Sequence, residues 1–181
     1  MSHSGEENLT LLLMAGLSGA GKTTLALALG RVLHWPVVDK DTLKSTLLLA
    51  GIAEQTAGPT AYDLMFAMGQ DLLVQQGLSV ILDSPALYAR GIKRAAQMAE
   101  MANARFKVVL CLADSRVRAR RMAERETRIS QLTAMTSSTE DDGLQHFLHL
   151  PADTLTIDTA RPLEEMIPAV LSFLNNYPGS K

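Results

Sequence analysis

Short apolar runs alternate with longer stretches of helical length along the chain. Each run is mostly aliphatic and is closed by Gly, Asp or Ala, which is typical of strands buried on both faces. We expect strands at Leu11–Ala15, Val37–Val38, Val80–Leu82, Phe106–Leu112 and Thr154–Ile157. We expect helices at Lys22–His34, Thr42–Leu49, Thr60–Gln76, Tyr88–Asn103, Ser115–Ile129 and Leu163–Leu174.

This alternation predicts an α/β fold in which helices cover both faces of a parallel sheet. One domain over residues 1–181, with one sheet of five strands, accounts for the length and for the absence of repeats. Ligands of such sheets bind beyond the carboxyl ends of the strands. We therefore expect the functional site among the strand-end residues, which are Gly16, Asp39, Asp83, Asp114 and Asp158.

Composition and charge limit the kinds of partner. Hydrophobic residues make up 47% of the chain and charged residues 20%, as in globular proteins. The formal net charge of -2 gives no global basic field for nucleic acid or an anionic membrane. Glu6 and Glu7 stand where a signal peptide would be positive, so we expect a cytoplasmic protein. The lone Cys111 lies in an apolar run, and we expect a buried structural thiol.

A glycine-rich segment follows the first expected strand. Residues 16–23 read Gly-Leu-Ser-Gly-Ala-Gly-Lys-Thr and fit the phosphate-binding pattern G-x-x-x-x-G-K-[ST]. Glycines let backbone N–H groups approach one phosphate, and the N-terminus of the next helix adds a positive dipole. We expect Lys22 to bridge the β- and γ-phosphates of ATP and the Thr23 hydroxyl to ligate Mg²⁺. The residues expected to bind nucleotide here are Gly16, Ser18, Gly19, Ala20, Gly21, Lys22, Thr23 and Thr24.

The rest of the sequence narrows the class of P-loop protein. The guanine-reading pattern N-K-x-D of GTPases is absent. Transporter-type ATPases, AAA-type motors and helicases need further signatures, longer cores or paired domains. The compact P-loop kinases remain, and three features of the sequence favour them.

The first feature is a pair of carboxylates, Asp39 and Asp41, after the second expected strand. Phosphoryl transfer to a hydroxyl needs a carboxylate that orients the acceptor and takes its proton near the metal. Residues i and i+2 of an extended chain face one side, so both carboxylates could enter the cleft. We predict that Asp39 is catalytic or binds the metal and that Asp41 contacts substrate. Which of the two is the base is open, and a helix N-cap is the alternative for Asp41.

The second feature is Asp83, which closes an apolar strand as a Walker B carboxylate does. We predict that it holds Mg²⁺ or engages the acceptor. A cap of the turn at Ser84 and Pro85 is the alternative.

The third feature is a crowd of arginines between residues 116 and 128. Like charges on one helical stripe repel unless an anion neutralises them, so we expect phosphate contacts, with Arg125 catalytic. A solvated face balanced by Glu124 and Glu126 is the alternative. The stripe consists of Arg118, Arg121, Arg125 and Arg128.

With these residues in place, the chain resembles the small P-loop kinases of the adenylate-kinase-like fold. It is most similar to the kinases grouped with chloramphenicol phosphotransferase, zeta toxins and the kinase domain of polynucleotide kinase. The resemblance implies a three-layer α/β/α fold with strand order 2-3-1-4-5. It also implies a mobile lid at residues 127–143 and acceptor-binding helices at about residues 42–76.

The resemblance also implies roles for single residues. Asp39 would be the base or a ligand of Mg²⁺-bound water. Arg121 would stack on adenine and Arg125 would contact phosphate, as in the lid entrance of adenylate kinases. The loop with Arg161 and Pro162 would read the adenine edge through its backbone.

We therefore predict an ATP- and Mg²⁺-dependent phosphotransferase that acts on a hydroxyl of a small molecule. The apolar bias of the acceptor region favours a neutral or partly apolar compound. The alternatives are a regulatory P-loop ATPase, or a kinase of a polynucleotide 5′-hydroxyl or nucleotide sugar. An aromatic content of 4% argues against a polynucleotide. Expected acceptor contacts are Asp41, Lys44, Tyr62, Asp83 and Arg90, with Met65, Phe66 and Tyr88 as further candidates.

Two further expectations concern residues outside this site. We expect Met68 to belong to the core. His146 and His149 lack a third ligand nearby, so we expect them at the surface and not in a metal site.

Overall fold

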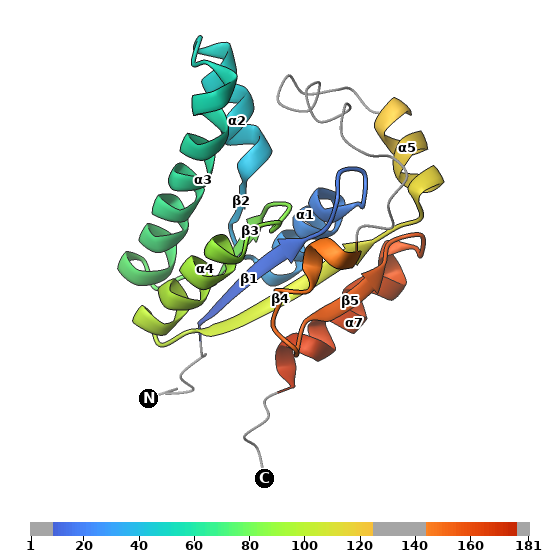
Figure 1. The fold of residues 1–181 in the computed structure, drawn as a ribbon. Helices are drawn as coiled ribbons and strands as arrows, with labels where there is room; N and C mark the ends of the chain where they lie inside the picture. The colour runs from blue at the N-terminus through green and yellow to red at the C-terminus, as the bar shows by residue number, and fades with distance from the viewer. Residues whose placement is uncertain (1–8, 125–143, 177–181) are drawn as a thin grey trace, which may run out of the picture.

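The structure is a computed structural model and describes residues 9–124 and 144–176. Its strands form one sheet in the order β2-β3-β1-β4-β5, and every neighbouring pair is parallel. The predicted α/β class, the five parallel strands and the strand order are confirmed (Figure 1). The strands are β1 (Thr10–Ala15), β2 (Val37–Asp39), β3 (Val80–Asp83), β4 (Arg105–Leu112) and β5 (Leu155–Asp158).

The described helices follow the predicted stretches closely at most of their ends. They are α1 (Lys22–Leu33), α2 (Lys40–Leu49), α3 (Glu54–Gln70), α4 (Ala89–Met101), α5 (Ser115–Glu124) and α7 (Leu163–Asn175). A π-helical turn, η1 (Asp71–Gln75), continues α3, and a 3-10 turn, η3 (Leu144–Phe147), precedes β5. The residues predicted to extend α5 to Ile129, and the predicted lid at 127–143, lie outside the described residues.

Helix α3 differs most from its prediction, because it begins at Glu54 and not at Thr60. Pro59 lies inside this helix. A proline there removes one backbone hydrogen bond. Buried packing at Ala57, Ala61, Met65 and Phe66 offsets that loss.

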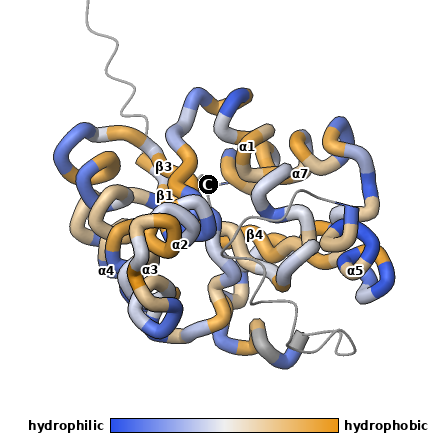
Figure 2. The backbone as a smooth tube through the Cα atoms, turned by 90° about the horizontal axis from the view of Figure 1, so that it is seen from above, coloured by the Kyte–Doolittle hydropathy of each residue, from blue (hydrophilic) through white to orange (hydrophobic). Residues whose placement is uncertain are grey.

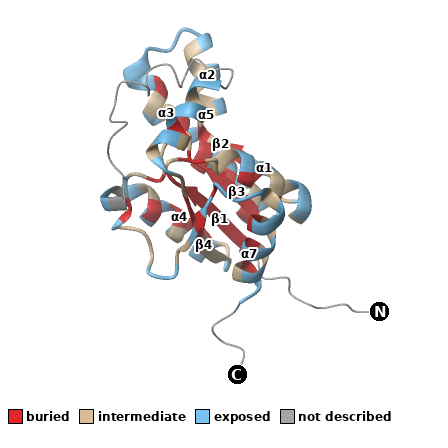
Figure 3. Ribbon diagram, turned by 90° about the vertical axis from the view of Figure 1, so that its right-hand side faces the viewer, coloured by how far each residue is buried: buried red, intermediate tan, exposed pale blue. Residues whose placement is uncertain are grey.

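The sheet separates two apolar layers, and the alternation of β1 shows why. Leu11 and Leu13 pack with the buried side chains of α3 and α4, whereas Leu12 and Met14 pack with those of α1 and α7. Successive side chains of a strand point to opposite faces, so β1 is apolar from Leu11 to Ala15 and contributes to both layers. Figure 3 shows this burial along the central strands, in red.

The carboxyl edge of the sheet lies between two groups of helices. Figure 1 shows α2 and α3 rising on one side of this edge and α5 on the other. Helices α2 and α3 pack against each other, and α5 is largely hydrophilic (Figure 2). Met68 is 46% exposed on α3, so its predicted place in the core is wrong. Within the described residues, no helix is long and apolar enough to cross a membrane.

Candidate functional site

The loop between β1 and α1 forms a cradle at the carboxyl edge. Gly19 and Gly21 have φ of 77° and 80°, which favours glycine. A Cβ at Gly19 would lie 2.7 Å from the carbonyl oxygen of Arg118, so the loop and α5 approach too closely for a side chain. Gly21 is the N-cap of α1 and offers no side-chain cap. The first N–H groups of α1 therefore stay available to an anion.

Lys22, Thr23 and Asp83 meet beside this cradle. The Lys22 ammonium donates to the carbonyl oxygen of Leu17 at 3.0 Å. The Thr23 hydroxyl donates to Asp83 Oδ2 at 2.5 Å. Asp83 is 2% exposed, and its Oδ1 has no hydrogen-bond partner among the described residues. Burial raises the pKa of the Asp83 carboxyl, whereas the Lys22 ammonium and the Thr23 hydroxyl lower it.

This group fits a magnesium ion that arrives with a polyphosphate. Among the described residues there is no cluster of three or more His, Cys, Asp or Glu that could hold a metal by itself. Mg²⁺ usually takes one or two protein oxygens and completes its shell with phosphates and water. The free Oδ1 of Asp83 and the Thr23 hydroxyl oxygen are suitable ligands, directly or through water.

Asp39 caps α2. Its Oδ1 accepts from the backbone N–H of Asp41 at 2.8 Å, and its Oδ2 accepts from the Thr42 hydroxyl at 2.7 Å. The capping function that we considered for Asp41 thus belongs to Asp39, because α2 begins at Lys40 and not at Thr42. Asp41 lies in the first turn, where its carboxylate pairs with the Lys40 ammonium at 2.7 Å.

Asp39 and Asp41 enter one cavity, as expected, although the expected reason is wrong. Their segment is not extended, since the strand ends at Asp39 and the helix begins at the next residue. The cavity measures about 290 Å³, and we call it the P-loop cavity. It is lined by Ser18, Gly19, Gly21, Lys22, Thr23, Thr24, Asp39, Asp41, Asp83, Ser84, Pro85 and Arg121.

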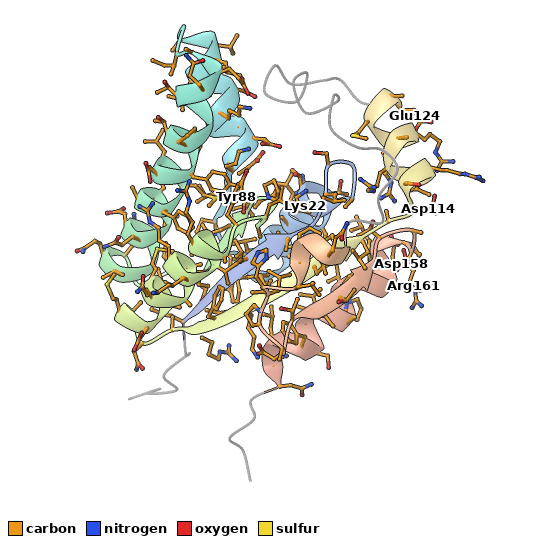
Figure 4. All side chains as sticks on the ribbon, in the orientation of Figure 1. Lys22, Tyr88, Asp114, Glu124, Asp158 and Arg161 are labelled. Carbon is orange, nitrogen blue, oxygen red and sulfur yellow. The ribbon has the colours of Figure 1, made fainter. Side chains whose placement is uncertain are left out.

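The remaining predicted nucleotide contacts do not line this cavity. Ala20 is a buried residue of the loop, and the Gly16 N–H donates to the carbonyl oxygen of Pro85 at 3.2 Å. Arg161 and Pro162 are exposed in the β5–α7 connection, where Pro162 caps α7. Figure 4 shows Arg161 at this connection and Lys22 at the start of α1.

A second cavity, of about 380 Å³, lies beside the first, and we call it the side cavity. Ser84 lines both cavities, so they share a wall at the end of β3. Tyr62 hydrogen-bonds to the Ser84 side chain, and burial raises the pKa of its phenol, which keeps it neutral. The side cavity is lined by Leu13, Pro59, Tyr62, Asp63, Phe66, Ser84, Ala86, Leu87, Tyr88, Arg90, Gly91, Ile92 and Arg94.

The predicted acceptor contacts divide between these cavities. Tyr62 and Arg90 line the side cavity, whereas Asp41 and Asp83 line the P-loop cavity. Lys44 lines neither, because its ammonium pairs with the Glu54 carboxylate at the start of α3. Among the further candidates, Phe66 and Tyr88 line the side cavity and Met65 is fully buried.

The arginine stripe is partly described. Arg118 is buried at 6% exposure, and Arg121 is half-buried and lines the P-loop cavity. Arg120 lies at the surface, with its guanidinium 3.9 Å from the Glu124 carboxylate. The solvated alternative thus describes Arg120, whereas Arg118 and Arg121 turn inward. Arg125, predicted to be catalytic, and Arg128 lie outside the described residues.

Thr159 is a site residue that sequence reasoning missed. It is 3% exposed, and its hydroxyl lies 2.9 Å from the carbonyl oxygen of Ala20 and 3.1 Å from that of Leu112. Arg121 donates to the Thr159 hydroxyl at 3.0 Å and to its carbonyl oxygen at 2.7 Å. One threonine therefore connects the P-loop, the end of β4 and α5. Its position directly after a strand-end aspartate was the available signal.

The two remaining predictions concern Cys111 and the histidines. Cys111 is fully buried, and burial raises the pKa of its thiol to about 12, which confirms a structural thiol. His149 is half-buried, with Nε2 3.0 Å from the carbonyl oxygen of Ala86, and the side chain of His146 is outside the described part of the structure.

A comparison with protein families shows the family of this chain. A family model described as an AAA domain matches residues 11–149. No curated protein matches the chain.

Solved structures share the fold at low sequence identity. A proposed kinase from Chloroflexus aurantiacus J-10-fl has a TM-score of 0.71 at 22% identity, over 94% of this chain and 98% of its own. The APS kinase of Mycobacterium tuberculosis, in complex with AMPPNP and APS, has a TM-score of 0.65 at 20% identity, over 93% of this chain and 99% of its own. The shikimate kinase of Bacteroides thetaiotaomicron has a TM-score of 0.62 at 16% identity, over 92% of this chain and 99% of its own. At these identities the likeness shows the fold alone.

Proposed function

This chain belongs to the family described as an AAA domain, and from its P-loop site we propose that it is a P-loop phosphotransferase of the small-kinase type. It would move the γ-phosphate of Mg·ATP to a hydroxyl of a small molecule. Structures of similar fold include an APS kinase solved with AMPPNP and APS and a shikimate kinase. Both are kinases of small molecules, which supports the same reaction type for this chain.

One observation carries the proposal: the two cavities share Ser84. Transfer requires the acceptor hydroxyl to lie in line with the γ-phosphate, so the two substrates must occupy adjoining spaces. A regulatory ATPase needs only the nucleotide space. The side cavity, at about 380 Å³, has the size of a small-molecule site.

The described residues would have separate roles in such a transfer. The loop amides and the Lys22 ammonium would hold the β- and γ-phosphates. Thr23, Asp83 and Asp39 would hold the Mg²⁺ shell, and the ion would neutralise charge on the phosphates. We assign the acceptor's proton to Asp41 and the capping of α2 to Asp39, whose two oxygens both accept hydrogen bonds at the start of that helix.

The test of this function has a binding step and a turnover step. Calorimetry is expected to detect ATP binding in the presence of magnesium. ADP release should be slow with ATP alone and faster with a suitable acceptor from a panel of hydroxyl metabolites, antibiotics and oligonucleotides. ATP binding with no stimulation by any acceptor, and with a nucleotide-dependent protein partner, would instead support the regulatory alternative. Stimulation by oligonucleotides alone would support the polynucleotide alternative.

A prediction at Thr159 follows from its place between the P-loop and Arg121. Thr159→Val removes the hydroxyl at nearly constant volume and leaves the Ala20 carbonyl oxygen without that donor. The Leu112 carbonyl oxygen keeps the Thr159 N–H at 2.9 Å. We expect the Kd for ATP to rise about fivefold, because one buried hydrogen bond is worth about 1 kcal/mol.

Two matched variants separate positioning from general damage. Thr159→Ser keeps the hydroxyl and should keep ATP affinity within a factor of about three, which is about 0.6 kcal/mol. Thr156→Val makes the same change at an exposed position of β5 and should change nothing. Unchanged ATP affinity in Thr159→Val, measured by calorimetry, would refute the positioning role.

A further inference from the structure

The side cavity carries one positive charge that no described residue balances. Its charged lining consists of Arg90, Arg94 and Asp63, so two guanidinium groups face one carboxylate. Arg94 donates to Asp63 at 2.6 Å, and its guanidinium lies 4.6 Å from the centre of the Phe66 ring. Arg90 makes no hydrogen bond or ion pair with the described part of the chain. Arg94 is thus already engaged, whereas the charge of Arg90 is available to a ligand.

The surroundings of Arg90 have the same electrostatic sign. Arg90 lies in the first turn of α4, which contains no acidic residue and has no side-chain cap. The amide dipoles at a helix start add positive potential, here to a cavity that already holds the guanidinium. Gly91, the next residue, also lines the cavity. An anionic group on the ligand would therefore be favoured at this wall.

The other walls indicate the shape of the ligand. The rings of Tyr62, Phe66 and Tyr88, with aliphatic neighbours, would cover an apolar or cyclic body. The volume of about 380 Å³ lies near the lower end of the range for small-molecule sites, which fits one compact ring. Ser84 marks the side of the cavity that adjoins the P-loop cavity, where Asp41 and Asp83 lie.

We propose that the acceptor is a compact hydroxylated carboxylate, with its carboxylate on Arg90 and its hydroxyl toward Ser84. The proposal rests on the phosphotransferase function and names the substrate class of that same site. It replaces the neutral acceptor expected from the apolar residues, because the unbalanced charge became visible only in the folded chain. One free guanidinium matches one carboxylate, which it can bind through two parallel N–H donors.

The transfer exchanges one P–O bond for another. The acceptor oxygen forms a bond to the γ-phosphorus, and the bond from this phosphorus to the β–γ bridging oxygen breaks. ADP leaves with that electron pair, and the hydroxyl proton passes to the Asp41 carboxylate. The acceptor carboxylate on Arg90 takes no part in the bond changes and serves only to orient the hydroxyl.

The test compares matched pairs of probes that differ only in charge. One pair is 4-(hydroxymethyl)benzoate and 4-(hydroxymethyl)benzamide, and another is 3-hydroxycyclohexanecarboxylate and its carboxamide. Neutral sugar alcohols and amino alcohols complete the panel. Kd is measured by calorimetry with magnesium and a non-hydrolysable ATP analogue present, and ADP release is measured separately with ATP. We expect carboxylates to bind at least about tenfold more tightly than their amides, as for a charge-assisted hydrogen bond.

Two variants assign this preference to Arg90. Arg90→Gln should remove the difference between carboxylate and amide without lowering the melting temperature, because Arg90 is exposed and makes no hydrogen bond or ion pair with the described residues. Lys93→Gln removes the same charge from an exposed position of α4 that lines neither cavity, and it should keep the preference.

The possible results separate this proposal from the proposed function. Tighter binding of neutral or cationic probes, no binding of any carboxylate, or a preference that survives Arg90→Gln would each overturn the carboxylate proposal. Arg90-dependent carboxylate binding without ADP release from any probe would support the site and count against the phosphotransferase. Acceptor-stimulated ADP release with neutral compounds alone would do the reverse.

Discussion

Lys22→Ala is expected to lower acceptor-dependent turnover by about a hundredfold to a thousandfold, the effect of removing one preorganised charge from a transition state. Phosphoryl transfer spreads negative charge over the γ-phosphate oxygens, and Lys22 is the cation at the start of α1 that would meet it. The substitution also acts on Asp83. Because the Lys22 ammonium lowers the pKa of this buried carboxyl, its loss raises that pKa further and favours the protonated acid, a poorer ligand for Mg²⁺.

The fold should survive this substitution. Within residues 9–124 and 144–176, the ammonium donates only to the carbonyl oxygen of Leu17, on the same loop, so the melting temperature is expected to change little. Lys93→Ala, at an exposed position of α4, provides the matched control and should keep wild-type turnover. Turnover of Lys22→Ala within a few-fold of wild type would contradict the assignment of the phosphate site.

The P-loop was predictable because its chemistry is local. Eight consecutive residues contain the glycines, the lysine and the threonine, and the strand before them and the helix after them show in the apolar pattern. The strand order, in contrast, came from the resemblance, since periodicity does not say which strands are neighbours. Asp83 was predicted as a site residue because it ends a strand, and ligands of such sheets bind beyond the carboxyl ends of the strands.

The contacts that complete the site join distant parts of the chain. Thr159 reaches the Ala20 carbonyl oxygen across 139 residues, and no local pattern marks such a contact. The side cavity also depends on folding, because most of its lining comes from α3, from α4 and from the connection between β3 and α4. The pairing of Arg94 with Asp63, which leaves Arg90 available, is likewise visible only after folding. For these reasons the sequence predicts the region that holds the acceptor residues, but it does not predict which of their charges are paired in the folded chain.

Asp41→Asn is expected to lower acceptor-dependent turnover by about a hundredfold to ten-thousandfold, the usual effect of removing a general base. Asparagine keeps the shape of the side chain but cannot take the acceptor's proton. Asp39→Asn should have a smaller effect on turnover, because an asparagine oxygen can still accept the Asp41 N–H and cap α2. The two variants thus show which aspartate is the base, a question that the sequence left open.

A third variant tests whether Asp39 acts through the helix. Asp39→Ala removes the acceptors of both the Asp41 N–H and the Thr42 hydroxyl, and loss of an N-cap costs about 1 kcal/mol of stability. We expect a lower melting temperature for Asp39→Ala and not for Asp39→Asn, with turnover measured for each at saturating Mg·ATP. If Asp39→Asn lost turnover as completely as we expect for Asp41→Asn, while Asp41→Asn stayed active, the base would be Asp39. The capping carboxylate would then have to exchange its bond to the helix for the acceptor proton during each cycle.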